Sequence, residues 1–322
     1  MWRYRDELEG VGDVWRAVLT EPLAVSRPQA IDDGRPLVAI GSGCSFAVAA
    51  LAAEVLRSRS TRSAFCTPFD AEGYIEPGST VLMITAAAAH PDVFHVLEIA
   101  THRHAQAVVV TLNRSGTMDS DASRLRSSIV TSPVHVDSRG FIPARAPTAL
   151  AALVLKLAFG ASPLDQFLSI PHDAQMAHRA QSLQFATLRD VSSIHVIRDN
   201  VGNFAAVDLE TRLLETALAS VTISDPWNFG HGRYMSLLTP GLRAGVVLAG
   251  SSLSNRALGR VAAALPTEIP CVHIDVSGTS LRDSLMCWFR AMWLVDAIAA
   301  SRGVDPAEVH ATPWGDTLYR ER

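Results

Sequence analysis

The feature that most constrains the fold of this chain is a repeated alternation of short apolar segments with helical patterns. The apolar segments have the length and β-branched content of buried strands: 36–40, 80–86, 105–112, 192–198, 244–250 and 269–277. Parallel strands are joined by crossover helices that cover both faces of the sheet, so this order predicts an α/β fold. Because the alternation stops and restarts once, we expect two αβα three-layer sandwiches in tandem, each with a flavodoxin-like parallel sheet.

Turn residues and helical patterns set the expected boundaries. The sequence predicts an N-terminal helical segment at 1–30, a first domain at 31–165, a partly helical connector at 166–190, and a second domain with a C-terminal tail at 191–322. Two domains suit a chain of 322 residues, since a domain takes roughly 100–200 residues.

Charge and hydropathy exclude several classes of partner. The formal net charge is −4 and the pI is about 6.2, which gives no basic field for nucleic acid or for an anionic membrane. The start of the chain is charged, and no apolar run reaches the roughly 18 residues of a membrane span. We expect a cytoplasmic protein.

The cysteines and the lysine limit the chemistry further. Four cysteines are scattered without CxxC spacing, so neither a zinc site nor a disulfide framework is expected. Lys156 is the only lysine, and any Schiff-base mechanism would need it. The histidines His90, His95, His102 and His104 lack a metal-ligand spacing, so we expect no metal and no cofactor.

A glycine turn follows the first predicted strand, with Gly41, Ser42, Gly43 and Ser45 in "GSGCS". These residues either line a ligand or simply permit a tight turn from strand to helix. A dinucleotide site is a poorer match, because Phe46 stands where the third glycine of GxGxxG would be.

Three segments resemble a known family: "GSGCSFAVAALAAEVL", "DLETRLLETALASVTISDPWNFGHGRYM" and "GVDPAEVHATPWGDTLYR". The chain is similar to tandem SIS (sugar isomerase) domain proteins, such as the isomerase half of glucosamine-6-phosphate synthase. It looks closest to a poorly characterised bacterial branch with an "NFAHGRH"-like segment. The resemblance implies a homodimer whose site borrows residues across the interface. It does not extend to the glutaminase half, so aminotransfer from glutamine is not expected.

The family holds sugar phosphates with a serine- and threonine-rich loop after the second strand of the first domain. The counterpart here is "TAAAAH", in which Thr85 can donate and Ala86–Ala89 cannot, while His90 stands near the last threonine of the pattern. Losing two or three hydroxyl donors, at about 1.5–3 kcal/mol each, would weaken phosphate binding about a thousandfold or more. Either phosphate binding is lost, or backbone amides and His90 rebuild it. The alanines favour a sugar-like or nucleoside-like ligand without phosphate.

The resemblance also implies a catalytic pair, Glu215 and His231, which stand sixteen residues apart. In the family pattern the glutamate shuttles a proton between C1 and C2, and the histidine opens the sugar ring. Asp208, Arg212 and Glu215 share one face of a predicted helix, as either a site wall or a solvated salt-bridge row. We expect the pair to meet in one pocket, within a chain or between two.

Two departures from the family leave the reaction open. Asn228 replaces a glutamate that precedes the histidine in the synthase, and the family's C-terminal lysine is missing from the tail. Arg233 is a candidate anchor for ligand hydroxyls or an anion. The sequence favours a cofactor-independent sugar isomerase-like or deaminase-like enzyme. The alternatives are a ligand-binding or regulatory protein without catalysis and a scaffold.

Overall fold

The computed structural model describes residues 3–23, 26–57, 60, 62–88, 90–113, 127–160, 162, 164–251, 256–308, 312 and 314. The chain forms two compact units, each with one parallel sheet. The five-stranded unit comprises Asp13–Ser138, Pro143–Leu168 and His310–Arg322, and the four-stranded unit comprises Met1–Gly12, Arg139–Ile142 and Ser169–Val309.

The five-stranded sheet has the order β2-β1-β3-β4-β5, and every neighbouring pair is parallel. Its strands are β1 (Leu37–Ile40), β2 (Ser63–Cys66), β3 (Thr80–Ala87), β4 (Gln106–Asn113) and β5 (Ser127–Thr131). The elements around it are α2 (Val11–Thr20), η1 (Gln29–Ile31), α3 (Cys44–Val55), α4 (Ala71–Tyr74), α5 (Pro91–His102), α7 (Arg145–Phe159) and η3 (Asp165–Phe167).

Helices α3 and α7 pack together against β1, β3 and β4, while α4 and α5 close a second apolar core with the same strands. The interior of α7 is buried almost throughout, which suits its long apolar sequence. In α5 the buried residues recur at three-and-four spacing, and the other side of the helix is exposed.

Lys156 lies inside this unit, on α7. Its Nζ donates to the backbone oxygen of Val18 at 3.0 Å and also to that of Glu21, so it holds the C-terminal end of α2. Burial lowers the pKa of this amine, with the nearby Glu21 acting in the opposite direction. A buried lysine that binds main-chain carbonyls is a structural residue, which argues against Schiff-base chemistry.

The four-stranded sheet has the order β7-β6-β8-β9 and is also fully parallel. Its strands are β6 (Ser193–Arg198), β7 (Ser220–Ser224), β8 (Ala244–Gly250) and β9 (Cys271–Asp275). The elements around it are α1 (Tyr4–Glu9), α8 (Ile170–Phe185), η4 (Ala186–Leu188), α9 (Asn203–Glu215), α10 (Pro226–Gly230), η5 (Arg233–Leu238), α11 (Arg256–Ala264), α12 (Leu281–Ser301) and η6 (Pro306–Glu308).

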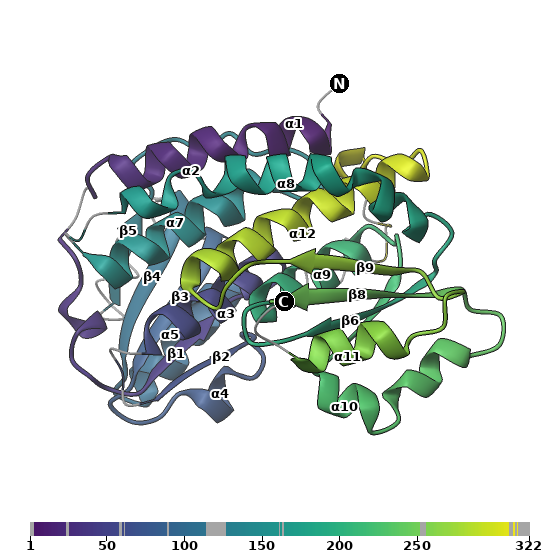
Figure 1. The fold of residues 1–322 in the computed structure, drawn as a ribbon. Helices are drawn as coiled ribbons and strands as arrows, with labels where there is room; N and C mark the ends of the chain where they lie inside the picture. Colours follow the sequence, from purple (N-terminus) through teal and green to yellow (C-terminus); the bar gives the residue numbers. More distant parts are fainter. Residues whose placement is uncertain are drawn as a thin grey trace. The chain divides into compact units, whose positions relative to one another are not determined.

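Helix α12 is the centre of packing in this unit and contacts α8, α9 and α1 (Figure 1). A capping box starts it: Ser280 Oγ accepts from the Asp283 backbone N–H at 3.3 Å, and Asp283 Oδ2 accepts from the Ser280 N–H at 3.0 Å. On the other side of the sheet, α10, η5 and α11 cover an apolar cluster that includes Phe229, Leu248 and Leu258. The sheet is therefore covered on both faces.

The two parallel sheets with helices on both faces confirm the predicted fold class. The sequence pattern missed β2, β5 and β7, which are edge strands with partly exposed side chains. Helix α9 ends at Glu215, and the chain turns at Ala217, whose φ is 53°.

Candidate functional site

The glycine turn and the alanine loop lie next to each other in the five-stranded sheet. Strands β1 and β3 are parallel neighbours, with Ile40 opposite Met83. The turn at 41–45 follows β1, and the last residues of β3, 85–87, lead into residue 88 at the same edge of the sheet. The strand order reverses between β1 and β3, and ligands of open α/β sheets bind at such switch points. The structure thus brings together the ligand residues predicted in this unit: Gly41, Ser42, Gly43, Ser45, Thr85 and His90.

Backbone geometry explains both glycines of the turn. A Cβ on Gly41 would lie 2.5 Å from the backbone oxygen of Ser45, and Gly43 has a φ of 54°. The backbone N–H of Ser45 donates to the Ser42 oxygen at 3.1 Å, which starts α3. The glycines are therefore needed for the turn itself, while Ser42 is exposed and Ser45 is half-buried.

The polar groups of the alanine loop are already used inside the loop. Thr85 Oγ1 donates to the Ala87 backbone oxygen at 3.0 Å and accepts from the Ala87 N–H at 3.3 Å. His90 caps α5, since its Nδ1 accepts from the Asp92 N–H at 3.3 Å. Ala88 is buried, and Ala89 lies outside the described residues. The end of the helix that would hold a phosphate is thus capped by the protein's own imidazole.

We expect fructose 6-phosphate to raise the melting temperature no more than fructose does at the same concentration. The reason is that the loop offers few free donors to a phosphate. Differential scanning fluorimetry with both sugars measures this, because a ligand stabilises in proportion to ln(1 + [L]/Kd). A phosphate-specific stabilisation that is lost in Thr85→Val would show instead that the loop still binds phosphate.

Asp208 and Arg212 form a buried ion pair on α9. Arg212 Nε donates to Asp208 Oδ2 at 2.6 Å, and Arg212 Nη1 donates to the Tyr4 hydroxyl at 3.1 Å. Both charged side chains are 0% exposed. The solvated salt-bridge row is therefore wrong for these two residues. Because both side chains are fully buried, neither can contact a ligand in this conformation. The pair connects α9 to α1 through the Tyr4 hydroxyl.

Glu215 and His231 do not meet within one chain. Glu215 ends α9 shortly before β7 begins at Ser220, whereas His231 follows α10, which starts after β7 ends at Ser224. The two residues therefore flank opposite ends of β7, a strand about 13 Å long. The strand therefore separates the two residues within one chain, because the amino and carboxyl ends of a strand lie at opposite edges of a parallel sheet.

Glu215 is suited to proton transfer by its surroundings. The residue is exposed, yet desolvation raises the pKa of its carboxyl; the charge of Arg212 opposes this and that of Asp208 adds to it. A carboxylate with a raised pKa is a stronger base than one in open water.

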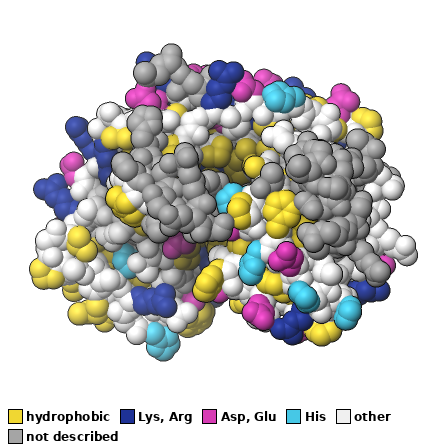
Figure 2. All heavy atoms as spheres, turned by 180° about the vertical axis from the view of Figure 1, so that it is seen from behind, with side chains coloured by type: hydrophobic (Ala, Val, Ile, Leu, Met, Phe, Trp, Pro, Cys, Tyr) yellow, Lys and Arg dark blue, Asp and Glu magenta, His cyan; other side chains and the backbone are white. Residues whose placement is uncertain are grey.

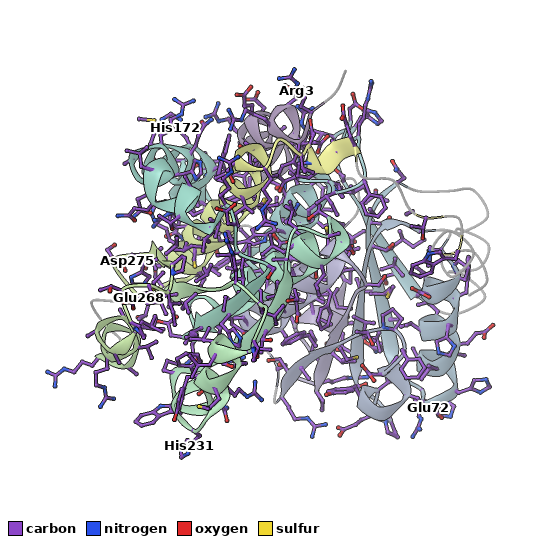
Figure 3. The ribbon with its side chains drawn as sticks, turned by 90° about the vertical axis from the view of Figure 1, so that its right-hand side faces the viewer. Arg3, Glu72, His172, His231, Glu268 and Asp275 are labelled. Carbon is purple, nitrogen blue, oxygen red and sulfur yellow. The ribbon has the colours of Figure 1, made fainter. Side chains whose placement is uncertain are left out.

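The segment around His231 is held by Asp225 and Arg233. The Asp225 carboxylate accepts from the backbone N–H groups of Trp227 and Asn228, both at 2.9 Å, and from Asn228 Nδ2 at 2.5 Å, which lowers the pKa of Asp225. Arg233 Nη1 donates to the Ile223 backbone oxygen at 3.1 Å. Asn228 and Arg233 are thus engaged in local structure, while His231 is exposed at the outer edge of α10 (Figure 3).

Sequence reasoning missed two polar residues of the four-stranded sheet. Asp199 follows β6 and accepts from the N–H groups of Gly202 at 3.1 Å and Ser251 at 2.9 Å, so it bridges the loops at the switch point of this sheet. His195 lies on β6, is 2% exposed and has its Nε2 3.0 Å from Ser236 Oγ. Burial, followed by the charge of Arg233, lowers the pKa of His195. A charged residue directly after a buried strand was the available signal for Asp199.

The histidines of α5 do not assemble a metal site. His95, His102 and His104 are exposed, and Figure 2 shows histidine side chains at separate places on one face of the molecule. Among the described residues, no group of three or more His, Cys, Asp or Glu side chains is placed to hold a metal ion. Within the same part of the chain, no helix is both long and apolar enough to cross a membrane.

Comparisons with known proteins identify the fold. No protein-family model matches the chain, and no curated protein matches it in sequence. Glucosamine-6-phosphate deaminase from Thermotoga maritima is 12% identical, with a TM-score of 0.71 over 95% of each chain. The C-terminal domain of glucosamine-fructose-6-phosphate aminotransferase from Francisella tularensis is 11% identical, with a TM-score of 0.68 over 95% of this chain and 96% of that one. Tagatose-6-phosphate ketose/aldose isomerase from Escherichia coli is 14% identical, with a TM-score of 0.67 over 97% of this chain and 96% of that one. The chain shares the fold of these sugar-phosphate proteins over nearly its whole length.

Proposed function

We propose that this protein is a cofactor-independent enzyme that transfers protons on a sugar or sugar-containing metabolite, by ring opening followed by aldose–ketose isomerisation. The observation that carries the proposal is the full-length likeness in fold to an isomerase, a deaminase and an aminotransferase domain of sugar phosphates. The raised pKa of Glu215 supports it, because enolisation needs a base near an acidified carbon. We place the reaction in the cytoplasm.

The catalytic site in this proposal is built by two copies of the chain. Since Glu215 and His231 flank opposite ends of β7 within one copy, we assign Glu215 of one subunit and His231 of the other to each site of a homodimer. A two-fold dimer forms two such sites by the same contact. Glu215 moves the proton between C1 and C2, and His231 exchanges the proton of the ring oxygen.

The proposed substrate carries no phosphate that the protein must recognise. The hydroxyl of Thr85 and the imidazole of His90 bind their own loop, and three described alanines between them offer no side-chain donor. Ser42 and Ser45, at the adjoining turn, are the polar side chains left to contact sugar hydroxyls. Asn228 and Arg233 hold the His231 segment in place.

We expect Glu215→Gln to reduce proton exchange by about 100-fold or more, the usual scale for losing a general base. Incorporation of solvent deuterium at C1 or C2 of fructose and glucosamine, followed by NMR in D2O, measures this. His231→Asn should slow ring opening in the same assay. An active Glu215→Gln variant would remove Glu215 from the mechanism.

Mixed dimers test the two-copy site directly. A purified heterodimer of Glu215→Gln and His231→Asn chains should regain about half of the wild-type rate, because one of its two sites then contains both native residues. If both residues acted within one copy, each site of the heterodimer would carry one substitution and no activity would return. A monomer in light scattering at micromolar concentration would contradict the dimer.

A second candidate is a sugar-binding regulatory protein without catalysis. The engaged side chains of Thr85, His90 and Asn228 favour it, since each departs from the family's polar site. This candidate predicts stabilisation by a sugar without any deuterium incorporation, which the two assays above distinguish.

A further inference from the structure

An apolar groove lies on the outer side of the four-stranded unit, between α10 and η5 on one side and α11 on the other. Its volume is about 730 Å³, and its apolar wall includes Trp227, Phe229, Leu238, Val261 and Leu265. Trp227 is 68% exposed and Leu238 is 63% exposed, so the apolar surface is open to solvent. Figure 1 shows α10 and α11 side by side below the sheet.

Small side chains on α11 keep the groove open. Ala257, Val261 and Ala264 all line it, and their spacing of four and three residues puts them on one helix face. Larger residues at these positions would fill the space against Trp227. The groove thus results from the small side chains of α11, and the apolar core lies folded beneath it.

Two nitrogen-bearing side chains at the groove have no anionic partner among the described residues. The Arg260 guanidinium carbon lies 5.8 Å from the centroid of the Trp227 ring, a cation–π contact, and Arg260 forms no ion pair with any described residue. The His231 side chain likewise makes no hydrogen bond to the described part of the chain. The neighbouring carboxylate of Asp225 is occupied by Trp227 and Asn228.

We propose that this groove binds a small amphiphilic anion, an organic carboxylate or sulfonate with an aliphatic or aromatic body. A volume of about 730 Å³ falls within the range of roughly 300–1,000 Å³ that small-molecule sites occupy. The apolar wall offers few hydrogen bonds to a bare sugar, whereas it buries a hydrocarbon body well. The positive charge of Arg260 matches the anionic group. His231 also lines the groove, so the groove adjoins the catalytic site of the proposed function. Anion binding at Arg260 goes beyond that function, which does not require it.

The test uses 8-anilinonaphthalene-1-sulfonate, whose fluorescence rises in an apolar site, with decanoate as a competitor, on the full chain. Arg260→Glu should weaken binding of the fluorescent probe by about tenfold or more, because a charge-assisted contact becomes a repulsion. Ala264→Phe should abolish saturable binding by filling the groove. Arg256→Glu and Ala263→Phe are matched controls, since both residues are exposed on α11 outside the groove, and they should bind like the wild type.

Three results would overturn the site. The first is equal probe binding by Arg260→Glu and Arg256→Glu, and the second is retained binding by Ala264→Phe in a variant with an unchanged melting temperature. The third is a change of molecular mass in light scattering caused by either groove variant, which would show that a second copy covers the groove. Glu215→Gln should bind the probe normally, so loss of the proposed catalysis leaves this inference standing.

Discussion

Arg212→Met is expected to lower the free energy of unfolding by about 3–5 kcal/mol, the scale measured for removing one partner of a buried ion pair. The loss is large because Asp208, which is 0% exposed, would keep a charge without its counter-ion. The lost contact to the Tyr4 hydroxyl adds to the cost. Urea denaturation followed by circular dichroism measures the change.

The double variant Asp208→Leu/Arg212→Met is the matched control. Replacing both charges by apolar side chains of similar volume is often neutral, so the double variant should recover most of the lost stability. Tyr4→Phe should cost about 1 kcal/mol, the usual size of one hydrogen bond. A double variant as unstable as Arg212→Met would mean that the charges are needed for more than each other.

The second large effect is a loss of stability in acid that depends on His178. Its ring stacks between Phe185, at 5.1 Å, and Trp293, at 5.4 Å, and the residue is 6% exposed. Burial, and after it the charges of Arg5, Arg290 and Arg179, together lower the pKa of His178 to about 4.

The direction of this pH effect depends on whether the folded or the unfolded chain binds the proton of His178 more tightly. The unfolded chain takes up a proton near pH 6.5, whereas the folded chain does so only near pH 4. The contribution of His178 to the free energy of unfolding is therefore constant above pH 6.5. It falls by about 3 kcal/mol as the pH drops from 6.5 to 4. Urea midpoints measured across this interval give the slope.

His178→Phe keeps the aromatic stack and removes the proton, so its stability should fall less steeply over the same interval. Some dependence should remain, because burial also lowers the pKa of His195 and His273. His172→Gln is the control, since His172 is exposed on the same helix (Figure 3). An unchanged slope in His178→Phe would show that the stacked ring does not carry the effect.

The central strands were predictable because burial on both faces leaves an apolar run. In β1 every residue is buried, and β8 is buried from Gly245 onward, so both stand out in the sequence. The edge strand β7, "SVTIS", alternates exposed and half-buried residues from Ser220 to Ile223, and its short pattern resembles a loop. Periodicity thus finds the interior of a parallel sheet more readily than its edge.

The candidate site was harder to predict from the sequence, because the spacing between two residues does not show whether their side chains are buried or exposed. A spacing of four residues is the same for a surface pair and for Asp208 with Arg212, whose third partner, Tyr4, is 208 residues from Arg212. The fifteen residues between Glu215 and His231 contain all of β7, and only the sheet topology shows that this strand separates them. Contacts between residues far apart in the sequence can be identified only from the three-dimensional structure.

The position of Lys156 has a practical consequence for handling the protein. The chain's one lysine points its amine into the interior, where it binds the carbonyl groups of Val18 and Glu21. Amine-directed dyes, biotin esters and coupled sensor surfaces therefore find no lysine on the folded exterior.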